Sequence, residues 1–411
     1  MEKIELKGVV MSFTKQQLEK YADVLIYALE TQRPNKKLKP YENVMIRYPA
    51  EELSLTTVIH RKLLKKKINV MLKSDPIAEI EKDYFSIADD RQIKFIPAGE
   101  KELFETLNGY ISIKAPSSLT HLKNIDSKKI SSKAIAFKKI KDILDKRESE
   151  GKFNWTLCSY PTGALSKAAG MSVKEYAGQI IKACFLNEKN PIKKWEEVFK
   201  NLGKIKKWLN SLAIDTMHVE SKSLDFEVTV GEKRKFISGA GCNIPSFEIF
   251  TCPDYRHTRG TFFADIPLYQ SGNLAKNIKL VFEKGKVIKA SASLNVNFIK
   301  KMLNTDAGAS RIGEFALVDK RFSKIDRFMA NTLFDENYGG KHGSFHIAVG
   351  KSFDDSFDGD PKNLTLSLKK KLGFNTSAIH TDMFNKEDKT VKAKLKNGKK
   401  ITIYEKGMFK I

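Results

Sequence analysis

The chain has 411 residues, enough for two domains, and its 73 Lys and Arg against 49 Asp and Glu give a formal net charge of +24. With 41% hydrophobic and 10% aromatic residues it can build packed cores, which excludes a disordered or collagen-like chain. Four cysteines without a C-x-x-C pair argue against a disulfide-stapled scaffold and a zinc-finger array. No secretory signal opens the sequence, and no apolar run is long enough for a membrane span. We therefore expect a cytoplasmic protein with no membrane partner.

The basic charge raises the alternative of a nucleic-acid-binding protein. The lysines, however, are spread along the whole chain, and the densest clusters, at 65–67 and 369–371, are short. No RNA- or DNA-binding signature accompanies them. A solvated, lysine-rich surface is the simpler interpretation, and we expect no nucleic acid among the partners.

The first half of the chain alternates strand and helix patterns. Apolar runs predict strands at residues 44–48, 68–72, 93–96, 110–114 and 154–160, and helical spacing covers residues 51–66 and 130–148. This order indicates a parallel sheet with helices on both faces. The glycine-rich G-x-G-x-x-G sequence of dinucleotide-binding domains does not follow the first strand. The expected fold is therefore Rossmann-like without the dinucleotide motif.

A helical bridge separates this half from the second. A capping box at Ser172 and Glu175 starts one helix, and another is predicted at 192–210. Beyond it, alternating strands at 224–230, 278–282 and 391–395 and a helix at 323–334 indicate an antiparallel-rich α+β unit. We expect an α/β protein with an N-terminal domain at 1–205, which includes the bridge, and a C-terminal α+β metal-binding catalytic domain at 206–411.

The second half contains acids and histidines in unusual surroundings. His380 and Asp382 are two residues apart, so on a strand both side chains would point from one face, although a surface turn is the alternative. Glu336 follows the predicted helix, and a glycine-rich loop would let the chain return to His346. His346 precedes an apolar run and needs a hydrogen-bond partner or a metal, or else is an ordinary core histidine.

Two further carboxylates, Glu248 and Glu314, lie among apolar neighbours. Such a carboxylate is costly to bury unless it is paired or bound to a metal, and on an alternating strand it could simply face solvent. Taken together, the acids and histidines of the second half are the ligand types of a site for two divalent metals that share a carboxylate.

Five motifs of the second half resemble, in order and spacing, those of the thermophilic aminopeptidase family of dinuclear metallopeptidases. They read NIPSFEIFTCPD at 243–254, IGEFALV at 312–318, LFDENYGG at 333–340, FHIAVG at 345–350 and IHTD at 379–382. Weaker matches at 160–162, 169–172 and 212–218 extend the resemblance into the first half.

The resemblance implies a metal-dependent aminopeptidase that removes N-terminal residues from peptides. It implies two divalent cations per chain, zinc, cobalt, manganese or magnesium, held at positions that match the family's ligands: Glu248, Glu314, Glu336, His346, His380 and Asp382. Glu314 and Glu336 are the implied catalytic carboxylates, with Glu314 as bridging ligand or base. Family members are dimers, so a homodimer is expected.

The chain departs from the family at one position. The family carries a Tyr seven residues after the His of its H-I-A-x-G motif, and here that position is Phe353. That Tyr is credited with a hydrogen bond to the tetrahedral oxyanion, and Phe has no donor. The alternatives are a slow enzyme, a substitute donor such as Tyr338, or a metal-binding homologue that binds peptides without cleaving them.

Overall fold

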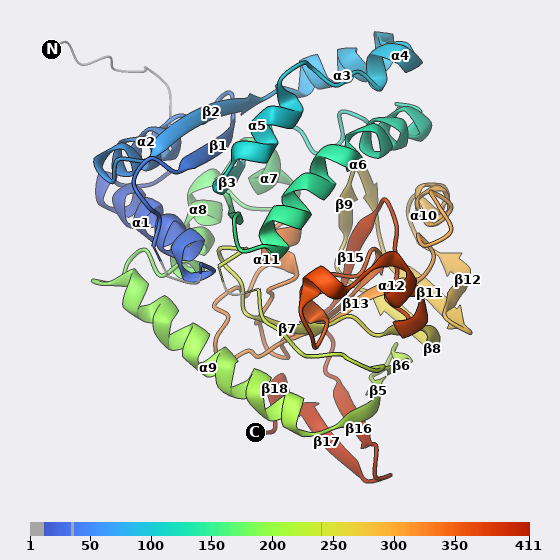
Figure 1. The fold of residues 1–411 in the computed structure, drawn as a ribbon. Helices are drawn as coiled ribbons and strands as arrows, with labels where there is room; N and C mark the ends of the chain where they lie inside the picture. The colour runs from blue at the N-terminus through green and yellow to red at the C-terminus, as the bar shows by residue number, and fades with distance from the viewer. Residues whose placement is uncertain (1–11, 34–36, 240) are drawn as a thin grey trace, which may run out of the picture.

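The computed structural model describes residues 12–33, 37–239 and 241–411. In the first half, four parallel strands form a sheet in the order β2-β1-β3-β4 (Figure 1). Its strands are β1 (Asn43–Pro49), β2 (Asn69–Asp75), β3 (Gly109–Lys114) and β4 (Asn154–Ser159). The helices around it are α1 (Lys15–Thr31), α2 (Ser54–Lys65), α3 (Ala78–Ile87), α4 (Asp90–Ile93), α5 (Glu100–Thr106) and α6 (Ser127–Ser149). The predicted parallel sheet between helices is confirmed.

The helices cover the two faces of this sheet because successive strand residues point to opposite sides. On one face, Ile46 and Ile111 belong to the same core as Leu25 and Leu29 of α1. On the other, Met45, Tyr110 and Trp155 pack with Leu103, Phe104 and Leu144 of α5 and α6. The helices α5 and α6 therefore lie over the face that carries the odd-numbered residues of β1.

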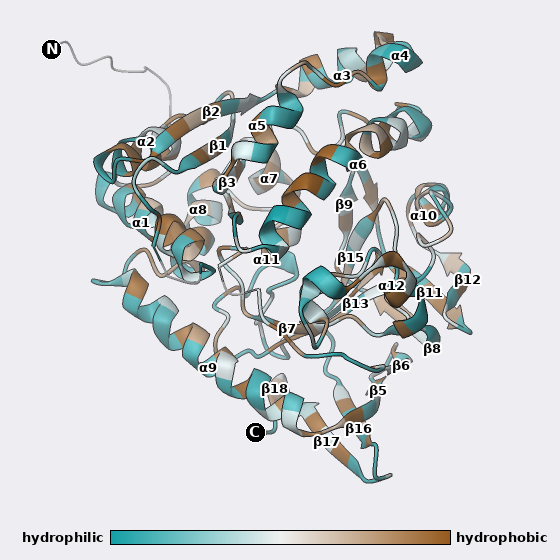
Figure 2. Ribbon diagram, in the orientation of Figure 1, coloured by the Kyte–Doolittle hydropathy of each residue, from teal (hydrophilic) through white to brown (hydrophobic). Residues whose placement is uncertain are grey.

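Three helices connect the two halves: α7 (Gly163–Ala168), α8 (Val173–Ala183) and α9 (Pro191–Ser211). The predicted capping box of α8 is present, with Ser172 and Glu175 bonded to each other's backbone N–H groups. The longest of the three, α9, shows the amphipathic alternation of polar and apolar residues in Figure 2. Its buried residues, among them Trp195 and Leu202, belong to the core that contains residues of both halves.

The second half contains two larger antiparallel sheets and a small hairpin. The eight-stranded sheet has the order β12-β11-β8-β6-β5-β16-β17-β18, and the four-stranded sheet has the order β15-β14-β13-β7. The strands of the larger sheet are β5 (Ile214–Glu220), β6 (Asp225–Thr229), β8 (Asp254–Ala264), β11 (Ile278–Glu283), β12 (Lys286–Ser291), β16 (Thr390–Leu395), β17 (Lys400–Glu405) and β18 (Met408–Phe409). Those of the smaller sheet are β7 (Glu248–Thr251), β13 (Ile312–Val318), β14 (Ser344–Gly350) and β15 (His380–Asn385). The remaining elements are the hairpin β9 (Leu268–Gln270) and β10 (Asn273–Ala275), the helices α10 (Val296–Leu303), α11 (Thr332–Asp335) and α12 (Leu366–Leu372), and the 3₁₀ turns Asp354–Ser356 and Pro361–Asn363.

Aromatic side chains join the two sheets of the second half. The ring of Phe345 on β14 lies 5.6 Å from that of Phe262 and 6.2 Å from that of Phe226, both on the larger sheet, and 4.9 Å from that of Phe315 on β13. Because strand side chains alternate, the neighbours of Phe315 and Phe345 point away from the larger sheet. Those neighbours include Glu314 and His346.

Two sequence predictions are wrong. The strand expected at 93–96 is absent, because Asp89 and Gln92 form a capping box that starts the short helix α4. The helix expected at 323–334 is reduced to α11. In a helix the Met329 N–H would bond the Ile325 carbonyl; here Met329 donates to the Asp335 carboxylate, 2.7 Å away, and Ile325 accepts from a glycine N–H of the 339–340 loop.

Candidate metal centre

One face of the four-stranded sheet carries five of the six predicted ligands. Along β13, Glu314 and Val318 share a face, and their antiparallel partners are Ala348 and Glu248. The same pairing continues to β15, where Asp382 opposes Ala348 and His380 opposes Gly350. The strand registry therefore brings together side chains from four different strands: Glu248, Glu314, His346, His380 and Asp382.

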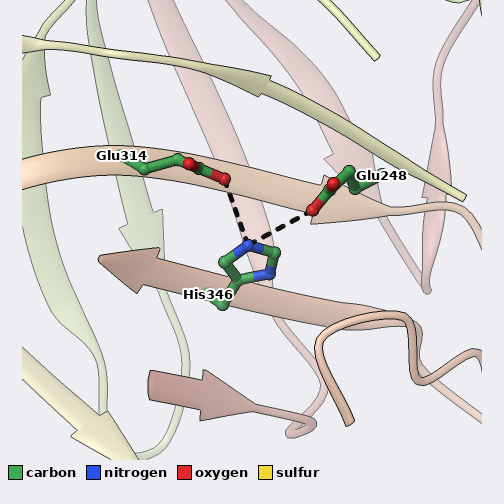
Figure 3. Close-up of side chains that lie close together, drawn as sticks. All are labelled: Glu248, Glu314 and His346. Carbon is green, nitrogen blue, oxygen red and sulfur yellow. Dashed lines mark hydrogen bonds and ion pairs between the residues drawn. The ribbon is translucent and has the colours of Figure 1, made fainter. Parts of the chain in front are cut away.

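Two groups of ligand atoms form on this face, and they share Glu314. The first comprises Glu248, Glu314 and His346, and the second Glu314, His380 and Asp382; within each group the ligand atoms lie within 4.8 Å of one another. Figure 3 shows Glu248 and Glu314 converging on the same ring nitrogen of His346. The Nε2 atom of His346 lies 3.4 Å from Glu314 Oε1 and 3.5 Å from Glu248 Oε2. Two ligand groups that share a carboxylate are suited to holding a pair of divalent cations.

The second group has similar distances. The Nε2 atom of His380 lies 3.2 Å from Asp382 Oδ1 and 3.5 Å from Glu314 Oε2. The His380 Nδ1 atom faces the backbone carbonyl of Lys351 at 2.7 Å. When Nδ1 donates its proton to this carbonyl, Nε2 keeps a lone pair that points into the group, which is the arrangement of a metal-binding histidine.

The sixth predicted residue, Glu336, is buried beside the two groups but belongs to neither. It follows α11, and its Oε1 atom accepts hydrogen bonds of 3.1 Å from the side-chain amides of Asn243 and Asn337. Neither asparagine was predicted from the sequence to be a functional residue. Asn243 is the first residue of the motif at 243–254, and this position could have identified it as a candidate site residue. Nothing in the sequence indicates that the Lys351 carbonyl contacts His380.

The electrostatics of the buried acids show strong mutual repulsion. Burial raises the pKa of Glu248 to about 8, and the negative charge of Glu314 adds to the shift. Burial likewise raises the pKa of Glu336 well above its usual range, with Glu248 as the next cause. Four carboxylates this close cannot all be ionised in a buried site unless cations lie among them.

The histidines shift in the opposite sense to ordinary buried imidazoles. Burial acts to lower the pKa of His380, but Asp382 and Glu314 outweigh it and bring the value to about 9. Burial also opposes the charged form of His346, yet Glu314 and Glu248 raise its pKa. Protonation of these two rings thus supplies positive charge between the carboxylates, where a cation would otherwise lie.

The residues fit divalent cations. Ligand atoms held at about 2.0–2.2 Å by a tetrahedral ion lie roughly 3.3–3.6 Å from one another, and the histidine–carboxylate separations of 3.2–3.5 Å are close to this spacing. They are longer than ordinary hydrogen bonds. Imidazole and carboxylate ligands suit zinc and several other divalent metals.

Phe353 lies beside the second group. Its ring is 4.5 Å from that of His380 and 6.1 Å from that of Phe250. The position predicted from the motif spacing is therefore adjacent to a candidate ligand. Tyr338, the substitute donor considered from the sequence, is partly buried against the main core.

A family model described as thermophilic metalloprotease (M29) matches residues 14–409, nearly the whole chain. The chain belongs to this metalloprotease family. The expected resemblance is thereby confirmed, and the acids and histidines gathered on the four-stranded sheet lie within the matched region.

Curated relatives of this metalloprotease are named as aminopeptidases. It is 27% identical over 368 residues to Aminopeptidase AmpS of Bacillus subtilis (strain 168), covering 83% of this chain and 86% of the relative. It is also 27% identical over 434 residues to Aminopeptidase 2 of Geobacillus stearothermophilus, covering 97% of this chain and 98% of the relative.

The solved structure named wild-type AmpT from Thermus thermophilus has the same fold. The two chains superpose with a TM-score of 0.79 at 22% sequence identity, over 97% of this chain and 100% of the other. The mixed architecture expected from the sequence is thus confirmed. Among the described residues, no helix combines the length and apolar character that a membrane crossing needs.

Proposed function

We propose that this protein is a metallo-aminopeptidase that removes N-terminal residues from peptides with the help of two divalent cations. The observation that carries the proposal is the pair of ligand groups that share Glu314 on one face of the four-stranded sheet. The aminopeptidase names of its relatives support the substrate class.

Charge balance supports two cations rather than one. Glu248, Glu314, Glu336 and Asp382 contribute four negative charges when ionised, and two divalent cations contribute four positive charges. The site is then neutral with both imidazoles uncharged, which is the form that binds metals. In our proposal His346 and Glu248 hold one cation, His380 and Asp382 hold the other, and Glu314 lies between them.

The chemistry follows from this arrangement. Two divalent cations bound by these residues would supply Lewis acidity, lowering the pKa of a water molecule and polarising the peptide carbonyl. Glu314 or Glu336 takes a proton from the attacking water and gives it to the leaving amine. The hydrogen bonds from Asn243 and Asn337 hold the Glu336 carboxylate in place for such a transfer.

The rival interpretations predict different observations. A metal-binding homologue with Phe353 in place of the family Tyr would bind metal and peptide but release no product. A basic nucleic-acid-binding protein would bring no stoichiometric divalent metal, and its affinity for nucleic acid would fall steeply with salt. Membership in the metalloprotease family favours the hydrolase over both.

The deciding experiment is a chelator-sensitive aminopeptidase assay with leucine p-nitroanilide and short peptides. We expect turnover to disappear with a chelator and return with added zinc, cobalt, manganese or magnesium. His380→Ala should reduce both turnover and the metal content measured by mass spectrometry, because it removes a ligand of one group. His218→Ala is the matched control, since His218 pairs with Asp225 on the larger sheet. Chelator-resistant turnover, or a protein that binds metal without any turnover, would contradict the proposal.

Three further expectations remain proposals. We propose a homodimer, to be checked by light scattering of the purified protein. We retain the division into residues 1–205 and 206–411, with α9 as the bridge that spans the boundary. The cytoplasmic location stays a prediction of the sequence.

A further inference from the structure

A row of residues leads across the parallel sheet to the candidate metal centre. The strand registry aligns Arg47 with Ser112, Ser112 with Leu157, and Leu157 with Asn243. Partners in parallel strands point to the same face of a sheet. At the end of the row, the Asn243 side chain donates a hydrogen bond to the candidate ligand Glu336. This face of the first half therefore continues into the metal centre of the second.

The row lies just beyond the helices that cover this face. In the preceding row, Met45, Tyr110 and Trp155 pack against apolar residues of α5 and α6, including Leu103 and Leu144. In the row that follows, an arginine and a serine stand where apolar residues would be expected in a covered sheet, beside Leu157.

Ser112 is the first sign of a missing partner. It is 4% exposed, and its Oγ atom has no hydrogen bond within the structure. A buried hydroxyl without a partner is costly, so such a group in a folded protein calls for an explanation. A bound ligand with a hydrogen-bond acceptor would provide one.

Lys114 is the second sign. It lies two residues after Ser112 on β3, so both side chains are on the same face. Within the described chain its Nζ atom has no hydrogen bond or ion pair. Burial and the nearby positive charge of Arg47 lower the pKa of Lys114, so its environment disfavours the charged form and an anion there would restore it.

The nearby acids already have other partners. Asp75 forms an ion pair with Arg47, and Glu81 lies 2.8 Å from His121 Nε2. They act on Lys114 only at longer range. Lys114 is therefore a partly buried cation whose close anionic partner is not supplied by these side chains.

A second contact joins Lys114 to the metal-centre region. Lys114 is in register with Ser159 of β4. The Ser159 hydroxyl accepts a hydrogen bond of 2.9 Å from Asn331, which caps α11, the helix that leads to Glu336. Both rows of the sheet thus reach the segment that carries a candidate ligand.

We propose that Lys114 and Ser112 bind the C-terminal carboxylate of a short peptide whose N-terminal residue lies at the metal centre. This inference rests on the proposed aminopeptidase function and names its substrate class. Neighbouring strands are about 4.8 Å apart, so Ser112 lies roughly 10 Å from Asn243 across two spacings. A peptide spans about 3.3–3.6 Å per residue, so two or three residues beyond the N-terminal one cover the distance from the Asn243 end of the row to Ser112. The expected substrates are tripeptides and tetrapeptides with a free C-terminus.

The test compares trialanine with trialanine amide, which lacks the negative charge. We expect the wild-type protein to prefer the free acid by about tenfold in kcat/KM, the ordinary effect of a charged hydrogen bond. Lys114→Gln should bring the ratio of the two kcat/KM values close to one. Lys65→Gln, which changes an exposed lysine on α2, is the matched control and should leave the ratio unchanged. A wild-type ratio near one, or an unchanged ratio in Lys114→Gln, would overturn the inference.

A second variant tests the same site in case Lys114→Gln does not fold. Ser112→Ala removes only the unpartnered hydroxyl, and it should lower the preference for the free acid as well. An unchanged preference for the free acid in Ser112→Ala would show that Ser112 does not bind the carboxylate. Should Lys114→Gln fail to fold, Ser112→Ala decides whether a carboxylate is bound here.

A binding measurement separates this inference from the proposed function. Calorimetric titration of the chelator-treated protein should show tighter binding of trialanine than of its amide, and Lys114→Gln should remove the difference. Tighter binding of the acid with no hydrolysis of either peptide would defeat the proposed function and leave the carboxylate site standing. Equal binding of the two peptides, with hydrolysis of both at equal rates, would overturn the carboxylate site and leave the proposed function standing.

Discussion

At the scale of single residues, Phe353 is the position where we expect the chain to depart from the family pattern. Its ring packs against that of His380, 4.5 Å between centroids. A phenylalanine there preserves the packing beside the ligand but offers no hydrogen to an oxyanion. We therefore expect Phe353 to affect the rate of the reaction rather than the assembly of the site.

We predict that Phe353→Tyr increases kcat by about tenfold or more while metal content stays the same, since one oxyanion donor contributes on the order of 10²–10³ in rate. The measurement is steady-state turnover of leucine p-nitroanilide with the metal content determined in parallel. Phe298→Tyr on α10 is a control for adding a hydroxyl elsewhere. If kcat does not change in Phe353→Tyr, the missing donor is not what limits this enzyme.

The residue patterns differ in how far they could be predicted. His380 and Asp382 were predictable as a pair because alternate residues of a strand share a face. Glu248 and Glu314 were noticed because carboxylates rarely stand in apolar runs. The role of the Lys351 carbonyl was not predictable, because every residue has a carbonyl and only the fold decides which one faces His380.

At the scale of secondary-structure elements, the end of β14 fixes the position of β15. Gly350 is paired with His380 and has a φ of +106°, a conformation that L side chains rarely adopt. A Cβ atom at this position would lie 2.1 Å from the Ile379 carbonyl oxygen. The close approach of the two strands next to a candidate ligand therefore depends on this glycine.

We predict that Gly350→Ala destabilises the protein by at least about 2 kcal/mol and reduces metal binding, because backbone strain is joined by a collision with β15. Gly398→Ala is a matched control, since Gly398 also has a positive φ, +86°, but open space around its Cβ position. It should show the cost of strain alone and keep full metal binding. Urea unfolding and metal titration would measure both variants; equal effects in the two would contradict a special role for Gly350.

Two elements show why local patterns fail. The apolar spacing of residues 323–334 is that of an amphipathic helix, yet the backbone groups of this segment bond to Asp335 and to the loop at 339–340. The apolar residues at 93–96 look like a strand, but the local capping box starts a helix before them. In one case a tertiary contact and in the other a local cap outweighed the periodic pattern.

At the scale of the whole molecule, the two halves meet around Glu148. This residue of α6 accepts a hydrogen bond of 3.0 Å from the Trp155 indole N–H. Burial raises its pKa to about 7, and the negative charge of Asp355 from the second half adds to the shift. The raised pKa means that folding favours the protonated carboxyl group over the ionised one.

We predict a loss of stability between about pH 4.5 and pH 7 that Glu148→Gln removes. The contribution of Glu148 is fully present below its unfolded pKa and is lost as the pH rises through its folded pKa, a loss of roughly 3 kcal/mol for a shift of this size. The variant should thus exceed the wild type in unfolding free energy at pH 8 and differ little at pH 5.

The measurement is urea unfolding of chelator-treated protein at both pH values. Glu150→Gln, a change at a neighbouring half-buried acid that pairs with Lys152, is the control. A stability difference between Glu148→Gln and the wild type that is the same at pH 5 and pH 8 would show that Glu148 does not titrate as expected.

The sequence by itself determined the fold class and the ligand types. Strand and helix periodicity indicated the parallel sheet and the antiparallel half. Five short motifs carried all six candidate ligand positions, and Phe353 was located by its spacing from His346. These features are local, because each depends on residues only a few positions apart.

Only the tertiary structure decided how these pieces meet. The registry of β7, β13, β14 and β15 places the candidate ligands in two groups around Glu314, with Glu336 beside them. The alignment of Ser112 with Leu157 and Asn243 joins the first half to the same site. The physical reason is that strand pairing and burial act between residues distant in sequence, so the partners of a buried polar group are set by the packed fold as a whole.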